Sequence, residues 1–499
     1  MNGAVTPTQR AADGLPDHLG ATREPGPDQE IRLRVPMLGF ERAAHLLRSA
    51  GARFITLFLA DAPEPSLLGA FALRGALVVL RARTGGADPV TYGALSETWP
   101  AARGAERELV ARFGVRPVGF APVRPLSDPD ADLIDPRVRG LDAFTIPYGP
   151  VRSGIFEAIQ FQIESGGESV PAIQTRLGFK HRGLERRFVG LAPDRAVHVA
   201  ERVAGIASVA YASAFSQAVE RALGISPTPN AERWRAVYAE LERMAAHLDV
   251  IAKQAETTAL YVGQARFQIL KEEVTRLKAR LTGSRFARGV IVPGGARSQG
   301  ELELDELLRI LDAVERDLVA DRRLFLDTAS MTDRLIGTGR LPRELIEEYC
   351  AVGPLARGSG VSTDARHERP YGDYRRLGLQ VVTERAGDAM ARVNVRFGEL
   401  LESLRILRQS VDHLRRNDHE LATPLPAGAS GAAFGWVEAP QGELVVWVQV
   451  RDGLVHHVHL ASPSQRNWAL FDHAFPADVL TDFAFIEHSF GLTPAGADR

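Results

Sequence analysis

The chain of 499 residues is 45% hydrophobic and 24% charged, a composition typical of a globular protein, and its length predicts about two to four domains. Its formal net charge is −2, from 60 basic and 62 acidic residues, which argues against a surface dedicated to nucleic acid or to an anionic membrane. The single cysteine, Cys350, excludes both an intrachain disulfide framework and a metal cluster held by several thiolates.

The N-terminal 30 residues resemble neither a signal peptide nor a folded element. They combine Pro, Gly, Asp and Arg without an apolar core, so we expect residues 1–30 to be a disordered lead-in. No stretch of the sequence approaches the roughly 20 apolar residues that a membrane-spanning helix needs. We therefore expect a cytoplasmic protein that reaches a membrane only through partner proteins.

Residues 31–140 predict a small α/β domain. Short apolar runs of strand length alternate there with segments of helical spacing, and Gly114 follows the last helix as a stop signal. The expected strands cover residues 31–35, 54–59 and 76–80, and the expected helices cover residues 40–49 and 99–113. A connector rich in Pro and Asp, residues 122–136, then marks a domain boundary.

Residues 141–499 predict a large, mainly helical bundle domain with peripheral β-strands, so the expected fold class is α+β. Apolar residues recur there at steps of three and four, which is typical of helices that pack on one another. These stripes span residues 234–251, 267–281, 304–318 and 397–414. Asn230 is the expected N-cap of the first helix. Strands are expected on both sides of a turn at Gly166-Gly167, and in a hairpin around Asp452-Gly453.

Several segments, taken in their order and spacing, resemble the large subunit of group 4 (energy-converting) nickel–iron hydrogenases and its relative, the 49-kDa-type subunit of complex I. The matching segments are residues 146–150, 177–185, 201–202, 218–220, 288–295, 353–360, 367–374, 462–468 and 498–499. Residues 106–115 and 124–126 resemble the 30-kDa-type subunit of complex I. The resemblance therefore implies a fusion, with residues 31–140 as the 30-kDa-type domain and residues 141–499 as the hydrogenase-like or 49-kDa-type domain.

In these hydrogenases two CxxC motifs bind nickel and iron through four thiolates, because soft sulfur ligands suit these metals. The resemblance places the first pair at Ala204 and Ala207, and the second pair at Thr493 and Gly496. None of these residues supplies a thiolate, and Cys350 lies outside both motifs. The resemblance thus implies a variant that lacks the nickel–iron cysteines, binds no metal, and is not a hydrogenase by its own residues.

Complex I relatives also lack these cysteines, and they use the same cavity as part of a quinone pocket in which a histidine and a tyrosine reach the quinone. Such a pair suits quinone reduction, which needs hydrogen bonds to two carbonyls and two protons. In this chain Arg152 stands at the histidine position and Gly205 at the tyrosine position. The expected replacement contacts to a quinone-type acceptor are Arg152, His181 and Tyr211.

Seven polar residues are candidates to line the cavity: Arg152, His181, Arg182, Glu185, Glu201, Arg202 and Tyr211. Two interpretations of the charged ones compete. The arginines at 182 and 202 either form buried structural ion pairs with the glutamates of their own motifs, or hold an anionic or carbonyl-bearing ligand. Structural pairing is the more common role of isolated charged pairs in helical bundles.

Other motifs have ordinary explanations. His456, His457 and His459 alternate along an expected strand, so at most two share a face, and solvated histidines are expected there instead of a metal site. The glycine-rich loops at residues 294–295 and 337–339 lack the sequence context of phosphate-binding loops, and we expect turns.

The resemblance implies a subunit of a membrane-associated, complex I-like or energy-converting-hydrogenase-related oxidoreductase complex, at the cytoplasmic side of the cell membrane. It further implies an electron supply linked to NAD(P)H or ferredoxin. The expected partners are a small iron–sulfur subunit, which carries the nearest cluster, and integral-membrane subunits. Two functions stay open: a cavity that binds a quinone-type or other redox acceptor, and a non-catalytic subunit that couples conformational change to ion translocation.

Overall fold

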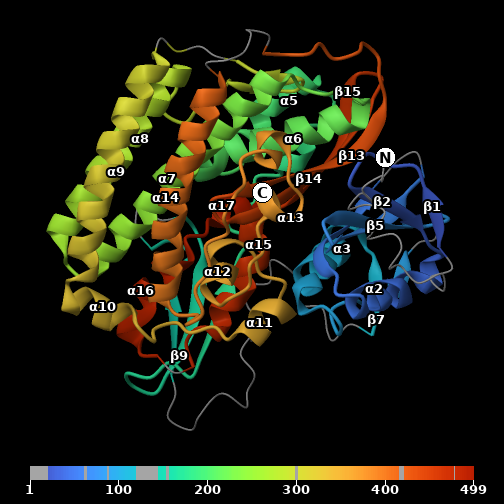
Figure 1. Ribbon diagram of the computed structural model, residues 1–499. Helices are drawn as coiled ribbons and strands as arrows, with labels where there is room; N and C mark the ends of the chain where they lie inside the picture. Colours follow the sequence, from blue (N-terminus) through green and yellow to red (C-terminus); the bar gives the residue numbers. More distant parts are fainter. Residues whose placement is uncertain are drawn as a thin grey trace. The chain divides into compact units, whose positions relative to one another are not determined.

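The computed structural model describes residues 21–60, 64–86, 89–119, 144–152, 157–297, 300, 302–414, 421–476 and 478–499 (Figure 1). The chain divides into two compact units. One is Met1–Asp132 with Glu348–Cys350, and the other is Leu133–Glu347 with Ala351–Arg499. The assignment of residues 31–140 and 141–499 to two subunit types stays a prediction.

The first unit is built on a five-stranded sheet. Its strands are β1 (Thr22–Glu24), β2 (Glu30–Arg34), β3 (Arg53–Ala60), β4 (Ser66–Leu73) and β5 (Ala76–Arg83), in the order β1-β2-β5-β4-β3. β2 and β5 are parallel, and the other neighbours are antiparallel. The helices α2 (Phe40–Ser49) and α3 (Arg103–Phe113) bury Leu47 and Leu109 in the same core. Gly114 ends α3 in the left-handed conformation, as predicted.

One expectation for this unit needs correction. β1 and the start of β2 lie within residues 22–30, so the expected disordered lead-in does not extend to residue 30. The predicted strands also leave out β4, an apolar run like those of β3 and β5 but with Gly69 in its middle, a residue that weakens a strand pattern. Residues 1–20 and the connector at 122–136 lie outside the described residues.

Four long helices form the bundle of the second unit: α7 (Pro229–Thr257), α8 (Tyr261–Thr282), α9 (Leu304–Leu326) and α14 (Ala389–Leu414). These helices lie against one another (Figure 1), and the apolar stripes that predict them are buried in the core. The N-cap of α7 is Thr228 and not Asn230. Its side chain accepts a hydrogen bond from the Ala231 amide at 3.2 Å, because Pro229 takes the first helical position.

A three-stranded antiparallel sheet packs against the small-residue helix α6 (Ser208–Leu223). Its strands are β13 (Gly431–Ala439), β14 (Gly442–Arg451) and β15 (Leu454–Ala461). The predicted turn joins β14 to β15, with φ angles of 50° at Asp452 and 77° at Gly453. A Cβ on Gly435 would lie 2.2 Å from the Ala214 carbonyl oxygen, so glycine is required where β13 approaches α6.

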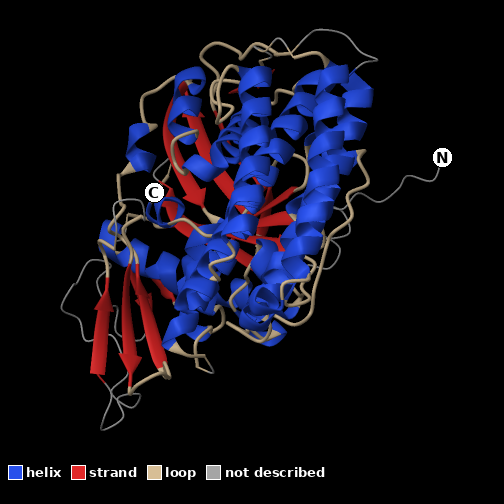
Figure 2. Ribbon diagram, turned by 90° about the vertical axis from the view of Figure 1, so that its left-hand side faces the viewer, coloured by secondary structure: helices blue, strands red, loops and turns tan. Residues whose placement is uncertain are grey.

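A smaller antiparallel sheet has the order β10-β9-β8, and the Gly166-Gly167 turn connects its strands β9 and β10, as predicted. Its strands are β8 (Phe144–Tyr148), β9 (Gln160–Ser165) and β10 (Ala172–Arg176). Helices predominate and strands lie beside them (Figure 2), so the α+β fold class is confirmed. In the part of the chain that the structure describes, no helix combines the length and apolarity that a membrane span requires.

A network of buried charges crosses the bundle. Arg357, on α12 (Gly353–Gly358), is fully buried and donates to the carboxylates of Glu399 and Glu438, at 2.8 Å each. Glu399 also accepts from Nε2 of His247 at 2.8 Å, and Nδ1 of this histidine accepts from Arg396 at 3.2 Å. Further buried members of the network are Glu240, Arg243, Asp364, Arg366, Tyr374 and Ser403. The apolar spacing that predicts these helices does not predict the buried charged residues.

This network predicts a pH dependence of stability through His247. Burial lowers its pKa to about 4, although the Glu399 carboxylate favours the charged form. The unfolded chain therefore binds this proton first, near pH 6.5, and stability is lost as the pH falls from there toward 4. Between about pH 7.5 and 5.5 we expect the wild type to lose about 1 kcal/mol more unfolding free energy than His247→Gln. Urea unfolding measures this, and equal pH slopes in both proteins would contradict it.

Candidate functional site

The two predicted motif positions meet at the C-terminal helix α17 (Pro494–Asp498), and one guanidinium nitrogen bridges them. Nη2 of Arg182 donates to the Val203 carbonyl at 2.6 Å and to the Ala495 carbonyl at 3.1 Å. These carbonyls directly precede Ala204 and Gly496 in the sequence. The structure therefore brings together the segments that the resemblance pairs. We refer to Ala204, Ala207, Thr493 and Gly496 as the vacated site.

The residues of the vacated site do not fit a nickel–iron centre. Ala204 and Ala207 are 2% and 1% exposed, and both end in methyl groups. A Cβ added to Gly496 would lie 3.2 Å from the hydroxyl oxygen of Tyr211 and 3.3 Å from Oγ of Ser462. These hydroxyl groups take up the space into which a side chain at position 496 would extend. None of the four residues offers a sulfur donor, so this site does not supply the ligands that the two metals require.

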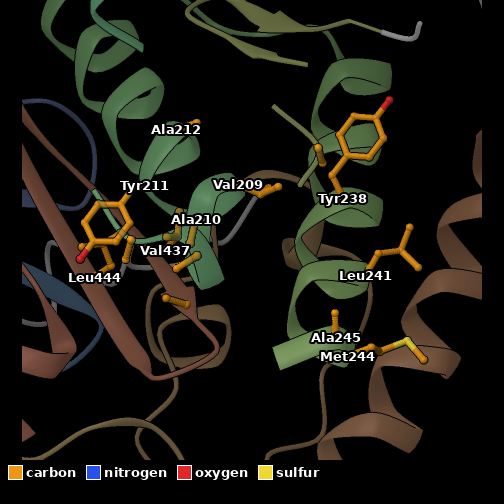
Figure 3. Packing of buried hydrophobic residues seen from close by; sticks show 14 of the residues in the cluster. Val209, Ala210, Tyr211, Ala212, Tyr238, Leu241, Met244, Ala245, Val437 and Leu444 are labelled. Atoms are coloured by element: carbon orange, nitrogen blue, oxygen red, sulfur yellow. The ribbon is translucent and has the colours of Figure 1, made fainter. Parts of the chain in front are cut away.

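Tyr211 is the central polar residue beside the vacated site. It lies in the first turn of α6 and is 2% exposed, with its ring beside Val437 and Leu444 of the sheet (Figure 3). Its hydroxyl group donates to Oγ of Ser462 at 3.1 Å. Burial raises the pKa of Tyr211 to about 12, although Ser462 and nearby arginines act in the opposite direction. The phenol is therefore neutral at physiological pH.

Glu157 belongs to the same site, and the sequence motifs do not single it out. Its Oε2 accepts from the Thr493 hydroxyl at 2.6 Å and from the Ala495 amide at 3.0 Å. The carboxylate thus holds the start of α17 and is close enough to influence Tyr211 electrostatically. No motif or spacing marks Glu157 in the sequence, where it is the only acidic residue between Pro150 and Gln160.

The segment that contains His181 fixes the end of α17. The Asp498 carboxylate accepts from the amides of Gly178 and Lys180, at 2.8 Å each. Nδ1 of His181 lies 2.8 Å from the Asp498 carbonyl oxygen, which only accepts, so this nitrogen donates. The predicted candidate His181 is therefore at the site, where it binds backbone.

One of the two interpretations of Arg182, a pairing with Glu185, does not match the structure. Glu185 instead pairs with Arg499, with 3.1 Å between Oε1 and Nη1, and Nδ1 of His459 lies 3.4 Å from the same oxygen. Gly183, in the left-handed conformation with φ of 60°, separates the two residues. Glu185 consequently faces β15 from the one-turn helix α4 (Leu184–Arg187), whereas Arg182 faces the vacated site.

The pairing of Arg202 with Glu201 is present but weak. The two side chains approach to 3.4 Å, and that of Arg202 is 55% exposed. Arg202 also donates to the His198 carbonyl at 2.6 Å. Glu201 is buried, and its other oxygen accepts from the Gly289 amide at 2.5 Å. Glu201 therefore mainly anchors the neighbouring loop, as a structural residue would.

Arg152 lies in a cluster of its own. It pairs with Glu487 on α16 (Phe483–Phe490) at 2.7 Å, and its guanidinium carbon lies 5.4 Å and 5.3 Å from the ring centroids of Tyr148 and Phe161. No hydrogen bond among the described residues joins it to Tyr211. The structure therefore does not bring these two predicted acceptor contacts together, because the ion pair holds Arg152 against α16.

The strand histidines are less solvated than expected. His459 is 6% exposed beside Glu185, and the ring of His457 packs edge-on against Trp447 with 5.3 Å between centroids. Of the three histidines, only His459 is buried, whereas His456 and His457 are half-buried. Within the described ranges, no group of three or more His, Cys, Asp or Glu residues is arranged to hold a metal ion.

Comparison with known proteins gives a family match and several relatives. Residues 255–427 match the family described as the respiratory-chain NADH dehydrogenase 49 Kd subunit. The membrane-bound hydrogenase subunit alpha of Pyrococcus furiosus is 30% identical over 325 residues, which are 62% of this chain and 76% of the relative. Formate hydrogenlyase subunit 5 of Escherichia coli is 26% identical over 447 residues, which are 83% of this chain and 78% of the relative.

A solved structure has the same fold. It is that of the membrane-bound sulfane sulfur reductase, an archaeal respiratory membrane complex, one chain of which matches with a TM-score of 0.67 and 23% identity. The match covers 72% of this chain and 99% of that chain. Together with this shared fold, the relatives above show that this chain belongs to the family of group 4 hydrogenase large subunits and complex I 49-kDa-type subunits.

Proposed function

We propose that the chain is the large-subunit-type component of a membrane-associated, complex I-like oxidoreductase complex, in which it works without a nickel–iron centre. The observation that carries the proposal is the vacated site, where the hydroxyl groups of Tyr211 and Ser462 fill the space beside Gly496. Relatives named as subunits of a membrane-bound hydrogenase and of formate hydrogenlyase support assembly into a multi-subunit complex.

Within this complex, the vacated site couples conformational change to ion-translocating partners. We refer to the hydrogen-bonded contact of its segments with α17 as the joint. Separate segments converge on α17, through Glu157 at its start, Arg182 at Ala495, and His181 at its end. In a metal-bearing relative, four thiolates would tie the corresponding segments to one another. Here hydrogen bonds perform this role, so the joint is maintained without redox chemistry in the chain itself.

A second candidate function is binding of a quinone-type redox acceptor. The protic groups of Tyr211, Thr493 and Glu157 lie near one another and near Arg182, and such groups suit a ligand that takes up hydrogen bonds and protons. This function requires the Tyr211 hydroxyl to exchange its bond with Ser462 for one with the acceptor. Because the Tyr211 hydroxyl is already bonded to Ser462 and Arg152 is already paired with Glu487, the coupling function is the better supported of the two.

The partners that fit this proposal are a small iron–sulfur subunit, which carries the nearest cluster, and integral-membrane subunits. The chain would then be peripheral on the cytoplasmic face of the membrane, held there by these partners. Relatives whose names include a membrane-bound hydrogenase subunit support such an arrangement.

The decisive experiment isolates the intact complex from membranes through a tag on this chain, and measures nickel and co-purifying subunits in the same sample. We expect membrane and iron–sulfur subunits without stoichiometric nickel, and no hydrogen-dependent dye reduction. Stoichiometric nickel would overturn the metal-free assignment, and a chain that purifies alone would overturn the assignment to a complex.

The same preparation separates the two candidate functions. The acceptor function predicts that Tyr211→Phe slows electron transfer to quinone by about tenfold or more, because the phenol proton is lost from the reaction. The coupling function predicts near-normal electron transfer in an intact complex. Tyr238→Phe on α7, which removes a hydroxyl group that donates to the Arg297 carbonyl, is the matched control.

A further inference from the structure

A buried carboxylate from α7 caps the helix that begins at the vacated site. α6 starts at Ser208, directly after Ala207, whose methyl group cannot accept a hydrogen bond from the first turn. Glu242 takes this role instead. Its Oε2 accepts from the Val209 amide at 2.7 Å, and its Oε1 accepts from the Ala210 amide at 3.0 Å. Glu242 therefore satisfies two amides that have no partner within the helix.

The turn that Glu242 holds also carries Tyr211. The first turn of α6 lies beside α7 (Figure 3), and Tyr211 directly follows Ala210 in it. The Tyr211 hydroxyl donates to Oγ of Ser462 at 3.1 Å. A Cβ added to Gly496 of α17 would lie 3.2 Å from this hydroxyl. Because the backbone of this turn sets where the phenol lies, Glu242 acts on the joint through Tyr211.

Few charges surround the Glu242 carboxylate, which belongs to a side chain that is 5% exposed. The cations that act on it are Lys278 of α8, which is 6% exposed, and the neighbouring Arg243 of α7. Lys271 and Arg285 act in turn on Lys278. Residues 205–211, which form the 3-10 turn before α6 and its first turn, have no charged side chain. The carboxylate is thus balanced by one buried lysine, one buried arginine and two backbone amides.

The protonation of Glu242 is linked to its hydrogen bonds with α6. Burial raises the pKa of Glu242 to about 7, whereas the Val209 amide, Lys278 and the Ala210 amide favour the charged form. Since the amides favour the charged form, a proton on the carboxylate weakens both bonds by the same linkage. The bonds are therefore strongest above about pH 7 and weaken as the pH falls through that value.

We propose that Glu242 is a positioning residue whose charge holds the first turn of α6, and that a proton taken up from solvent by its carboxylate loosens the joint. The proposal rests on the function proposed above, because it adds a proton-dependent element to the same joint. A coupling subunit without redox chemistry needs a group that links protonation to conformation. Glu242 does so by exchanging one proton with water, and no electron is transferred.

Hydrogen–deuterium exchange of the first turn of α6 tests the proposal in the intact complex or, where the chain purifies alone, in the full-length chain. After correction for intrinsic rates, protection of the Val209 and Ala210 amides should fall about fivefold from about pH 8 to pH 6, if the two bonds lower the carboxyl pKa by about one unit. In Glu242→Gln, which is neutral at every pH, protection should be low and constant. Peptides of β4, in the other unit, should show constant protection in both proteins.

Variants of Lys278 separate an effect of charge from an effect of packing. Lys278→Met removes a cation that favours the charged carboxylate, so the midpoint of the change in protection should move up by about half a pH unit or more. Lys278→Arg keeps the cation and should keep the midpoint. The control on the same helix is Arg280→Met, at a side chain that is 48% exposed and paired with Glu306, and it should also keep the midpoint.

Three results would overturn the role of Glu242: protection that does not change with pH in the wild type, a change that persists in Glu242→Gln, or a midpoint that Lys278→Met does not move. Each of them leaves the assignment to a complex intact. Conversely, a chain that purifies without partners overturns the proposed function, while the pH dependence of the first turn can still be measured on that chain.

Discussion

Replacing Arg357 with methionine should lower the free energy of unfolding by about 3–5 kcal/mol, because the change leaves buried carboxylates without their cation. Arg357 is fully buried and contacts Glu399 and Glu438, at 2.8 Å each. It also donates to the Thr363 carbonyl at 2.7 Å. Methionine fills much of the same volume, so lost charge compensation is the main cost. Urea unfolding of the full-length chain provides the measurement.

The pH dependence of this variant separates lost charge compensation from lost packing. Without Arg357, the pKa of each buried carboxylate should rise above its value in the unfolded chain. The folded variant is then more stable at low pH, where the carboxylates are protonated and neutral, and loses stability as the pH rises. The difference from wild type should therefore shrink as the pH is lowered. A difference that is constant with pH would point to packing alone. Arg316→Met on α9, at a side chain that is 74% exposed, should change stability by less than about 0.5 kcal/mol.

The helices of the bundle could be predicted from the sequence, whereas the charged network inside it could not. Leucines and valines at steps of three and four predict α7 and α14, because the stripe of a helix that faces the core is apolar. Glu240 and Arg243 lie within the buried part of α7, although their charges suggest solvent. Arg366 from a distant segment pairs with Glu240, and Glu399 on α14 lies 3.9 Å from Arg243. No local pattern reports such partners.

At the candidate site, too, the sequence predicted the neighbouring segments but not their side-chain contacts. The order of the motifs placed residues 177–185 and 493–499 at one cavity, but it did not predict which side chains pair. Glu185 pairs with Arg499, because the left-handed Gly183 turns α4 toward β15. Glu157 was missed because a single carboxylate between two motifs carries no periodic signal. Such pairings depend on backbone geometry that spans hundreds of residues of sequence separation.

The charged network and the vacated site are joined through α16. Arg396 donates to the carbonyl groups of Ser489 and Phe490, at 3.1 Å and 3.0 Å, which are the last residues of that helix. A cation at this end is favourable, because helical C-terminal carbonyls lack partners within the helix. Only a short link then separates α16 from Thr493 at the start of α17. The charged network therefore contacts the helix that directly precedes α17, and this contact supports the proposed coupling function.

A double-mutant cycle at Gly496 and Tyr211 should show that the tyrosine occupies the place of a ligand side chain. The added Cβ of Gly496→Ala would lie 3.1 Å from Cγ2 of Thr493, 3.2 Å from the Tyr211 hydroxyl and 3.3 Å from Oγ of Ser462. This contact is tight in a site with little room to relax, so we expect a loss of about 1–3 kcal/mol.

Tyr211→Phe removes the hydroxyl group that the new methyl group meets. In the Tyr211→Phe background, Gly496→Ala should therefore cost less than in the wild type, with a coupling energy of about 1 kcal/mol by urea unfolding. The same cycle with Tyr238→Phe on α7, which removes a hydroxyl group that donates to the Arg297 carbonyl, should be additive within about 0.5 kcal/mol. Additivity in the Tyr211 cycle would mean that its hydroxyl does not fill the space beside Gly496, and the site would then have room for a ligand.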